Sequence, residues 1–257
     1  MPTRTIHTAP AKGENVIRQI LKNLFMLFTW PLRIAICHEL KKQPPNLREQ
    51  DLGYILQKRA TESSADYVMA HMKNVDSTNS QAELLTLAIK QVNLESGPLV
   101  CEFGVFTGNT INHIAALVSG RIYGFDSFEG LPERWRDGYK KGAFTMNMLP
   151  RVRSNVTLVK GWFDQTLPPF IQQHKESIGL LHIDCDLYSS TKIIFELLAL
   201  QIHPGCVIVF DEYFNYPGWE EGEYKAFQEF IKTTGLGYEY IGYNRLHEQV
   251  AVKIKSA

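Results

Sequence analysis

Two pairs of acidic residues follow two short apolar runs in the second half of the chain. Asp184 and Asp186 come after the first run, at positions i and i+2. Asp211 and Glu212 directly follow the second run, Val207–Phe210. Side chains at i and i+2 of a strand point to the same side, and neighbouring strands lie ~4.8 Å apart. We therefore expect four carboxylates to converge within a few ångströms.

Converging carboxylates repel one another, and this repulsion raises some of their pKa values unless a cation is bound. Carboxylate oxygens are typical ligands of Mg²⁺ or a similar hard divalent ion. The sequence therefore predicts a divalent-cation site, with four separately solvated acids as the alternative. His182 lies two residues before Asp184, and we interpret it as a hydrogen-bonded core histidine rather than a ligand.

A strand-turn-helix segment precedes these acids in the chain. The run Leu99–Phe103 continues into Gly104-Val-Phe-Thr-Gly108 and then into a helix. The two glycines permit a tight turn and close approach of a ligand to the helix N-terminus. Their spacing differs from the Gly-x-Gly-x-x-Gly of nicotinamide binders, which favours a ligand without pyrophosphate. Glu102 could bind a cationic amino-acid portion of that ligand, and a purely structural turn is the alternative.

Asp126 follows the next apolar run, Ile122–Phe125, roughly 20 residues after the glycine turn. An acidic residue at this position accepts hydrogen bonds from a ribose diol, and a solvated loop aspartate is the alternative. Trp162 and Phe163 follow a third run, Val156–Val159. They could flank a flat adenine ring, although such a pair more often belongs to a core.

Strands and helices alternate along residues 96–257, which predicts an α/β domain of Rossmann-like type. The expected strands are Leu99–Phe103, Ile122–Phe125, Val156–Val159, Leu180–Ile183, Cys206–Phe210, Tyr238–Tyr243 and Gln249–Ile254, and the expected helices are Thr110–Val118, Thr191–Leu200 and Glu223–Thr233. This alternation is typical of a mostly parallel, here seven-stranded, sheet with helices on both faces. The last two strands could form an antiparallel edge. The residues above would then meet in the crevice at the carboxyl ends of the strands.

Residues 1–95 are expected to form a helical extension that completes an acceptor pocket or an oligomer interface. One helix is predicted near Ala65–Val75, and another begins at the capping box formed by Ser80 and Glu83. The apolar run within residues 16–36 is shorter than the ~20 residues of a spanning helix, and no signal-peptide cleavage site follows it. We expect this stretch to pack on the core or on a dimer partner, with weak membrane-surface contact as the alternative.

The overall composition excludes few classes of protein. Lys and Arg total 27 and Asp and Glu total 27, so bulk charge gives no support for a nucleic-acid partner. The four cysteines lack the spacing of a metal site, which favours buried, reduced thiols and a cytoplasmic protein. A homo-oligomer is expected.

With these residues assembled, the chain resembles the macrocin-type (TylF-like) sugar O-methyltransferases. The matching segments are Glu102-Phe-Gly-Val-Phe-Thr-Gly108, Asp126-Ser-Phe-Glu-Gly-Leu-Pro132, Lys160-Gly-Trp-Phe163, Thr166-Leu-Pro168, Asp184-Cys-Asp186-Leu-Tyr188 with Ser190-Thr191, and Phe210-Asp211-Glu212-Tyr213-Phe214. They occur in order from about residue 99 to residue 216, and the first hundred residues carry little of the resemblance.

The resemblance implies a class I methyltransferase fold, S-adenosylmethionine and Mg²⁺ as cofactors, and methylation of a hydroxyl of a sugar or glycosylated small molecule. By motif position, Asp184, Asp211 and Glu212 would hold the metal and Asp186 would be the general base. The family usually has Asp-Asp where this chain has Asp211-Glu212. The residues predicted to bind S-adenosylmethionine are Glu102, Gly104, Thr107, Gly108, Asp126, Ser127, Gly161, Trp162 and Phe163.

The segment Pro132–Arg153, with its aromatic residues, is predicted to be a mobile lid over the acceptor, with a structural Ω-loop as the alternative. Three other functions remain open. A catechol or phenol O-methyltransferase would have a flat aromatic acceptor pocket. A nucleotide- or NAD-binding Rossmann enzyme is disfavoured by the glycine spacing. A non-catalytic scaffold on the same fold would be expected to lack acids at 184, 186 or 211, and all three are present.

Overall fold

The computed structural model describes residues 50–256 of the 257-residue chain. The chain divides between Ile55 and Leu56 into two units, and the second unit contains the whole sheet. The apolar stretch at residues 16–36 and Cys37 lie outside the described residues. From residue 50 to residue 256, no helix is long and apolar enough to cross a membrane. The expected oligomer and the predicted division of the chain at residue 95 stay predictions.

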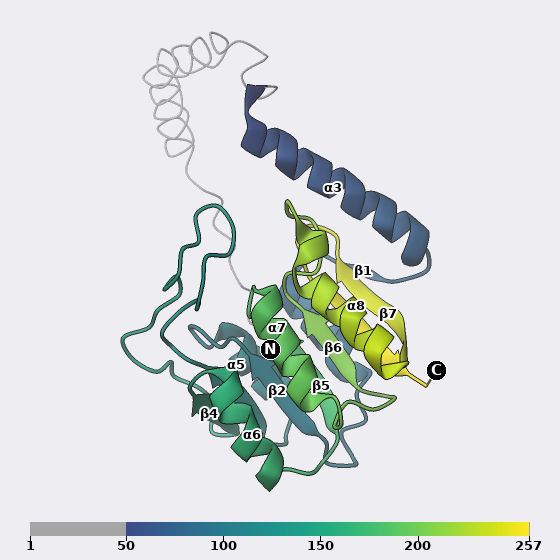
Figure 1. Ribbon diagram of the computed structural model, residues 1–257. Coiled ribbons are helices and arrows are strands. Elements are labelled where there is room, and N and C mark those ends of the chain that lie inside the picture. The colour runs from purple at the N-terminus through teal and green to yellow at the C-terminus, as the bar shows by residue number, and fades with distance from the viewer. Residues whose placement is uncertain (1–49, 257) are drawn as a thin grey trace, which may run out of the picture. The chain divides into compact units, whose positions relative to one another are not determined.

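Eight strands of the described residues form one sheet in the order β1-β7-β8-β6-β5-β2-β3-β4. Figure 1 shows this sheet behind helices α7 and α8. The strands are β1 (Ser77–Thr78), β2 (Leu99–Phe103), β3 (Ile122–Asp126), β4 (Val156–Lys160), β5 (Ile178–Ile183), β6 (Val207–Phe210), β7 (Gly237–Asn244) and β8 (Val250–Lys255). Only β8 runs antiparallel to its neighbours. Every residue of β2, β5 and β6 is buried, as expected for parallel strands covered on both faces.

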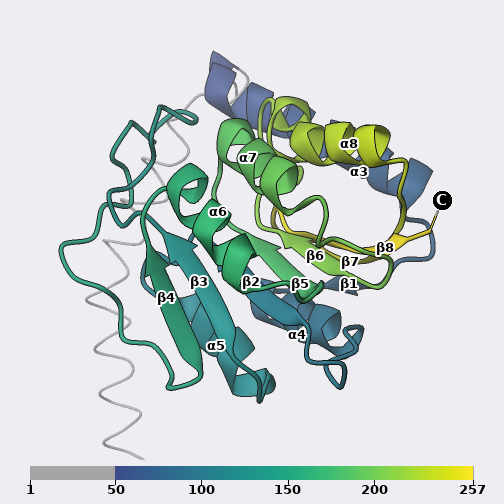
Figure 2. The ribbon, with the colours of Figure 1, turned by 60° about the horizontal axis from the view of Figure 1, so that its bottom comes forward.

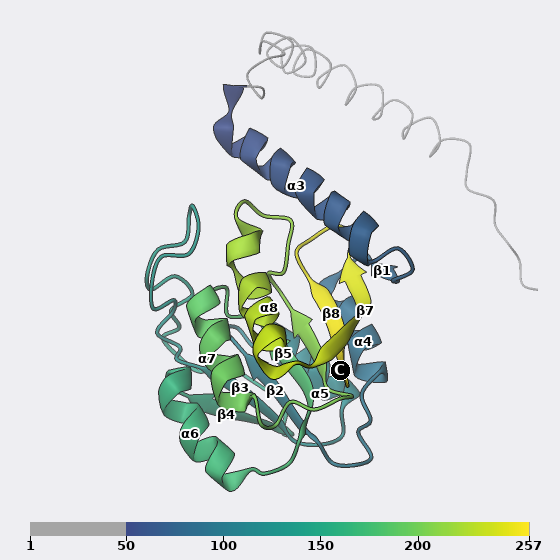
Figure 3. The same ribbon diagram turned by 45° about the vertical axis from the view of Figure 1, so that its right-hand side comes forward.

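Helices cover both faces of this sheet (Figure 2). The helices are α3 (Leu52–His71), α4 (Gln81–Lys90), α5 (Asn109–Leu117), α6 (Phe163–Gln173), α7 (Tyr188–Leu198) and α8 (Glu223–Thr234), with a short 3₁₀ turn, η1 (Trp219–Glu221). Helices α4 and α5 share one apolar cluster with the sheet, whereas α3, α6, α7 and α8 share the other. On that second face, Tyr67 of α3 packs against Tyr224 of α8 and Tyr240 of β7. Figure 3 shows the ribbons of α7 and α8 in front of the sheet on this face.

The predicted α/β fold is confirmed, and all seven predicted strands are present. The eighth strand, β1, has only two residues, which is too short to produce an alternating pattern. The last two strands are antiparallel as expected, but β8 lies between β6 and β7 rather than at the edge. Helix α6 was not predicted, because Pro168 and Pro169 lie inside it and proline disfavours helix interiors.

The helix that precedes β2 begins as its sequence predicts. Ser80 is the N-cap of α4, and its hydroxyl accepts a hydrogen bond from the Glu83 N–H. The Glu83 carboxylate accepts from the Asn79 N–H at 2.8 Å, one residue earlier than in a standard capping box. The preceding helix differs from its prediction near Ala65–Val75, since α3 spans Leu52–His71. Among the described cysteines, Cys101, Cys185 and Cys206 are all buried free thiols, as expected.

Candidate functional site

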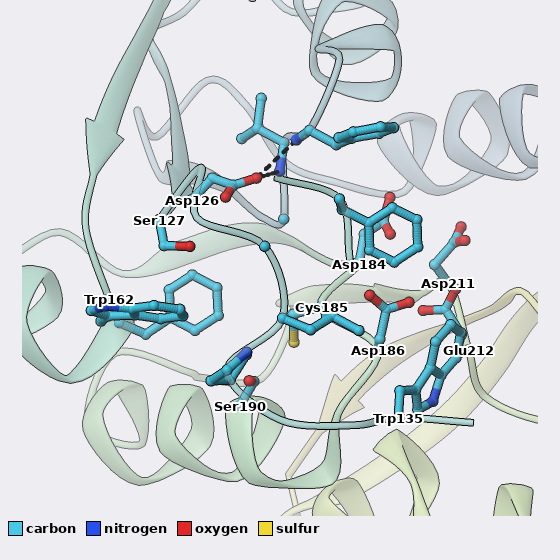
Figure 4. A pocket seen from close by; sticks show the side chains of 18 of the residues that line it. Asp126, Ser127, Trp135, Trp162, Asp184, Cys185, Asp186, Ser190, Asp211 and Glu212 are labelled. Atoms are coloured by element: carbon cyan, nitrogen blue, oxygen red, sulfur yellow. Dashed lines mark hydrogen bonds between the residues drawn. The ribbon is translucent and has the colours of Figure 1, made fainter. Parts of the chain in front are cut away.

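A cavity of about 710 Å³ lies at the carboxyl ends of the parallel strands (Figure 4). This volume falls within the roughly 300–1,000 Å³ typical of small-molecule sites. The predicted site residues that line it are Gly104, Thr107, Asp126, Ser127, Gly161, Trp162, Phe163, Asp184, Asp186, Asp211 and Glu212. Glu102 and Gly108 do not line it. The topology therefore brings together most of the residues that the sequence singled out, from segments more than a hundred residues apart.

The cavity opens where the strand order reverses, between β2 and β5. Such a switch point is the usual ligand site of an open α/β sheet. Gly104 follows β2 with φ +90°, and a Cβ added there would lie 1.7 Å from the carbonyl oxygen of Asp184. No residue with a side chain fits at this position, so glycine is required for the two strand ends to meet. Gly108, by contrast, is the N-cap of α5 and faces Pro150 and Val152.

The Asp126 carboxylate organises the turn after β2. One oxygen accepts hydrogen bonds from the N–H groups of Val105 and Phe106, both at 2.8 Å. The other accepts from the Phe128 N–H at 2.7 Å. Phe106 has φ +43°, and the bond to Asp126 helps to hold this uncommon conformation. Because a carboxylate has about four acceptor sites, one remains for a ligand hydroxyl.

Aromatic side chains and small residues form the adjoining wall. Trp162, the N-cap of α6, and Phe163 both line the cavity, near Ser127 (Figure 4). Gly161 connects β4 to α6 with φ +142°, and its N–H donates to the Asp126 carbonyl at 3.0 Å. A flat ring could enter between these groups, which agrees with the predicted adenine position; the individual roles stay predictions.

Glu102 lies beneath this wall rather than in it. Its side chain is fully buried, and its carboxylate accepts a hydrogen bond from the Thr110 hydroxyl at 3.0 Å. The other carboxylate oxygen is 2.9 Å from Nδ1 of His182, which is also fully buried. Strand register places these two residues side by side on β2 and β5. Both oxygens of Glu102 therefore have protein partners, and its predicted contact with a ligand stays a prediction.

The four predicted carboxylates gather on the opposite side of the cavity from Ser127 and Trp162 (Figure 4). Asp184 and Asp186 follow β5, and Asp211 and Glu212 follow β6. The Gln81 amide donates a hydrogen bond to Asp211. One oxygen of Glu212 is buried without a hydrogen-bond partner.

Sequence reasoning missed a fifth acid, Glu223. It is fully buried at the start of α8, and its carboxylate accepts from the Glu212 N–H at 3.2 Å. Burial, and then repulsion from neighbouring acids, raises the pKa values of Asp184, Glu212 and Glu223 well above their usual range. Burial also raises the pKa of Asp186 to about 7, with Asp211 adding to the shift and Arg136 opposing it.

The backbone of Asp186 is as unusual as its pKa. Its φ is +66°, a conformation that aspartate tolerates better than most residues. Uncommon backbone conformations of this kind cluster at functional sites. The surrounding turn is fixed by the Leu187 N–H, which donates to the Cys185 carbonyl at 2.7 Å.

A divalent cation fits this donor set. His182 Nε2 is buried without a hydrogen-bond partner, so the imidazole is satisfied at Nδ1 only. One ligand atom each from His182, Asp184 and Asp211 lies within 4.8 Å of the others. We interpreted His182 as a fully hydrogen-bonded core residue, and the structure contradicts this for Nε2. Its position two residues before Asp184, on the same face of the strand, was the available signal.

The segment Pro132–Arg153 walls the acceptor side of the cavity through Trp135, Arg136, Tyr139 and Phe144. The Arg136 guanidinium donates to both carboxylate oxygens of Glu248 at 3.0 Å and stacks 3.8 Å from the centroid of the Trp135 ring. Backbone hydrogen bonds between Leu131 and residues 142–143 close the base of the loop. The mobility of this segment as a lid stays a prediction.

Comparison with known proteins agrees with this geometry. Residues 101–213 match a family model described as a methyltransferase domain. The chain is 28% identical over 142 residues to the 8-demethyl-8-(2,3-dimethoxy-alpha-L-rhamnosyl)-tetracenomycin-C 4'-O-methyltransferase of Streptomyces olivaceus. That match covers 46% of this chain and 53% of the relative, so the chain spans about half the length of the curated protein it matches.

A similar fold occurs in the crystal structure of CalS11, a calicheamicin methyltransferase. The TM-score is 0.53 at 22% identity, over 82% of this chain and 93% of CalS11. The predicted Rossmann-like methyltransferase fold is thus confirmed, and the resemblance to sugar O-methyltransferases that the motifs indicated is found again in the matched relative.

Proposed function

We propose that this protein transfers a methyl group from S-adenosylmethionine to a hydroxyl of a sugar-containing small molecule, assisted by a divalent cation. One observation carries the proposal: a single continuous cavity joins the glycine turn and Asp126 on one side to the acidic cluster on the other. A donor nucleoside and a hydroxyl acceptor can therefore meet between them.

The donor would lie along the β2–α5 turn. The remaining acceptor site of Asp126 can receive one ribose hydroxyl, and Ser127 lies beside it. Trp162 and Phe163 can flank the adenine. Gly104 and Thr107 would face the amino-acid portion, since they lie where the turn leads into α5.

The acceptor hydroxyl would lie next to Asp186. The methyl group of a sulfonium is already activated, so the protein has mainly to align the attack and exclude water. A divalent cation at Asp184 and Asp211, with Glu212 as the third predicted ligand, would supply positive charge that lowers the pKa of the attacking hydroxyl. Asp186 lines the same part of the cavity and would accept the hydroxyl proton as the general base.

A sugar acceptor is favoured because the matched relative acts on a rhamnosyl group. The wall formed by Trp135, Tyr139 and Phe144 can pack against the apolar face of a sugar ring. The same aromatic wall would also suit a catechol or phenol, which remains the second candidate class. A non-catalytic scaffold is disfavoured because the acidic cluster is intact and two of its members, Asp186 and Glu212, are buried.

A transfer assay with methyl-labelled S-adenosylmethionine tests this proposal directly. Rhamnosides, other deoxysugar glycosides and catechols would each be supplied with Mg²⁺ or Mn²⁺. We expect label in a sugar product, and a loss of about 100-fold or more in Asp186→Asn, the size of a typical general-base contribution. Label only in catechols would contradict the sugar assignment, and label in no acceptor despite donor binding would favour the scaffold.

A further inference from the structure

We propose that Nε2 of His182 is a ligand of the divalent cation, together with Asp184 and Asp211, and that Glu102 orients the imidazole for this role. The proposal rests on the cation-assisted function above and names the ligands and metal preference of that same site. It assigns His182 the place that the motif pattern gives to Glu212.

Nε2 of His182 is the atom that indicates a bound ion. His182 has no exposed surface, and its Nε2 is buried with no hydrogen-bond partner among residues 50–256. A buried polar atom of this kind normally has a partner, and its absence calls for an explanation such as a bound ion. One ring nitrogen of His182 lies with carboxylate oxygens of Asp184 and Asp211 in a group whose members are all within 4.8 Å of one another. Because Nδ1 faces Glu102, Nε2 is the nitrogen available to a cation in this group. A cation between them would satisfy all three.

The contact between Nδ1 of His182 and Glu102 favours Nε2 as the ligand atom. A Glu102 oxygen lies 2.9 Å from Nδ1. An ionised carboxylate only accepts hydrogen bonds, so when Glu102 is ionised and the ring is neutral, the proton lies on Nδ1 and the lone pair on Nε2. Metal-ligating histidines typically donate their second N–H to a carboxylate, which fixes the tautomer and ring orientation. The Thr110 hydroxyl in turn holds the other oxygen of Glu102. Glu102 is thus a positioning residue, which explains why an acid is buried at the end of β2.

The chemistry of the three proposed ligands indicates which metal ion the site prefers. One imidazole and two carboxylates form a mixed nitrogen and oxygen set. Such a set suits Mn²⁺, Co²⁺ or Zn²⁺ better than Mg²⁺, which prefers oxygen ligands and water. Glu212 lies outside the group of three. Its side chain is longer than the aspartate usual in the family, and its unpartnered oxygen is free to accept from a water or hydroxyl at the site.

Mn²⁺ is the probe that tests this assignment in the 257-residue protein. Its affinity is measured from the free-ion electron paramagnetic resonance signal, and ¹⁴N modulation in pulsed spectra reports directly on a nitrogen ligand. We expect ¹⁴N modulation in the wild type and its loss in His182→Asn, which keeps a donor toward Glu102 but removes Nε2. Mn²⁺ affinity should fall about 10- to 100-fold, and Glu102→Gln should lower it less.

His174→Asn is the matched control. His174 caps α6 and packs on Tyr123 and Phe170, and it does not line the cavity. The His174→Asn variant should retain both the Mn²⁺ affinity and the ¹⁴N modulation of the wild type. In the wild type, Mg²⁺ should displace bound Mn²⁺ only when present in at least roughly tenfold excess.

Mn²⁺ that binds without ¹⁴N modulation and with unchanged affinity in His182→Asn would overturn the assignment. A wild type that binds no Mn²⁺ would also overturn it. Titration of S-adenosylmethionine into the same samples separates these results from failure of the proposed function. If the wild type binds S-adenosylmethionine, the methyltransferase proposal is unaffected by the metal result. If the folded wild type does not bind S-adenosylmethionine, the methyltransferase proposal itself is contradicted.

Discussion

Gly104 and Asp184 meet so closely that a Cβ on residue 104 would lie 1.7 Å from the Asp184 carbonyl oxygen. Gly104 directly follows β2, the strand that leads to the donor side of the cavity, and Asp184 is the first residue of the acidic cluster. This contact between backbones therefore sets the distance between the two halves of the site.

Replacing Gly104 with alanine should disrupt both halves, because backbone on both sides must move and residue 104 has φ +90°. We expect loss of detectable S-adenosylmethionine binding and a fall in melting temperature of roughly 10 °C, the effect of about 3 kcal/mol or more in a domain of this size. Differential scanning fluorimetry and calorimetry measure the two effects. Gly120→Ala is the control, since the nearest atom to its added Cβ would be 3.9 Å away; equal behaviour of the two variants would contradict the account.

Asp126→Ala should weaken donor binding. The substitution leaves the N–H groups of Val105, Phe106 and Phe128 without their acceptor, so the turn loosens and the ribose partner is lost. We expect a loss of about 1–3 kcal/mol in binding free energy, measured by calorimetry. Asp137→Ala, at a side chain that is 99% exposed and pairs only with Arg134 among the ion pairs of the described residues, should bind like the wild type. An unchanged affinity in Asp126→Ala would place the donor elsewhere.

Arg136→Lys should loosen the loop over the acceptor side. Lysine keeps the charge but has no planar guanidinium to stack on Trp135 while it donates to Glu248. We expect a higher KM for the acceptor and an unchanged affinity for the donor. Chymotrypsin should cleave faster at the aromatic residues of the segment Pro132–Arg153. Arg134→Lys, at an exposed pair, is the control. Cleavage as slow as in the wild type would indicate that other contacts hold this loop.

The acidic cluster should make the metal-free protein less stable as the pH rises. Burial raises the pKa of Asp186 from its usual value near 4 to about 7, and burial also raises the pKa values of Asp184 and Glu212. Between roughly pH 4 and pH 7 the folded state therefore binds more protons than the unfolded chain, so the free energy of unfolding falls as pH increases.

A bound cation should reverse this trend, because it replaces protons that the ligands must lose. Melting temperatures measured with and without Mn²⁺ should differ little at pH 5 and clearly at pH 8. A metal-free protein whose stability rises from pH 5 to pH 7, or stabilisation by Mn²⁺ that does not depend on pH, would contradict this description of the cluster.

Local patterns in the sequence predicted the parts of the site that lie at strand ends. An apolar run followed by a glycine or an acid indicates a strand that stops at the ligand edge, and Gly104, Asp126, Asp184 and Asp211 all line the cavity. The fold class could be predicted for the same reason, since strands and helices alternate with distinct periodicities.

Contacts between distant residues could not be predicted in this way. Glu102 and His182 are 80 residues apart, and only the register of β2 against β5 brings them together. Arg136 and Glu248 are 112 residues apart and meet through a loop without regular structure. A buried histidine also looks the same in sequence whether its second nitrogen is bonded or free, and this difference is what separates a core residue from a ligand.

Calorimetric titration of S-adenosylmethionine into the purified protein, with and without a divalent cation, tests the central claim most directly. The account predicts micromolar binding to the wild type in both conditions, and binding about 1–3 kcal/mol weaker in Asp126→Ala. No detectable binding to the folded wild type in either condition would contradict the methyltransferase assignment and favour a non-catalytic role for the fold.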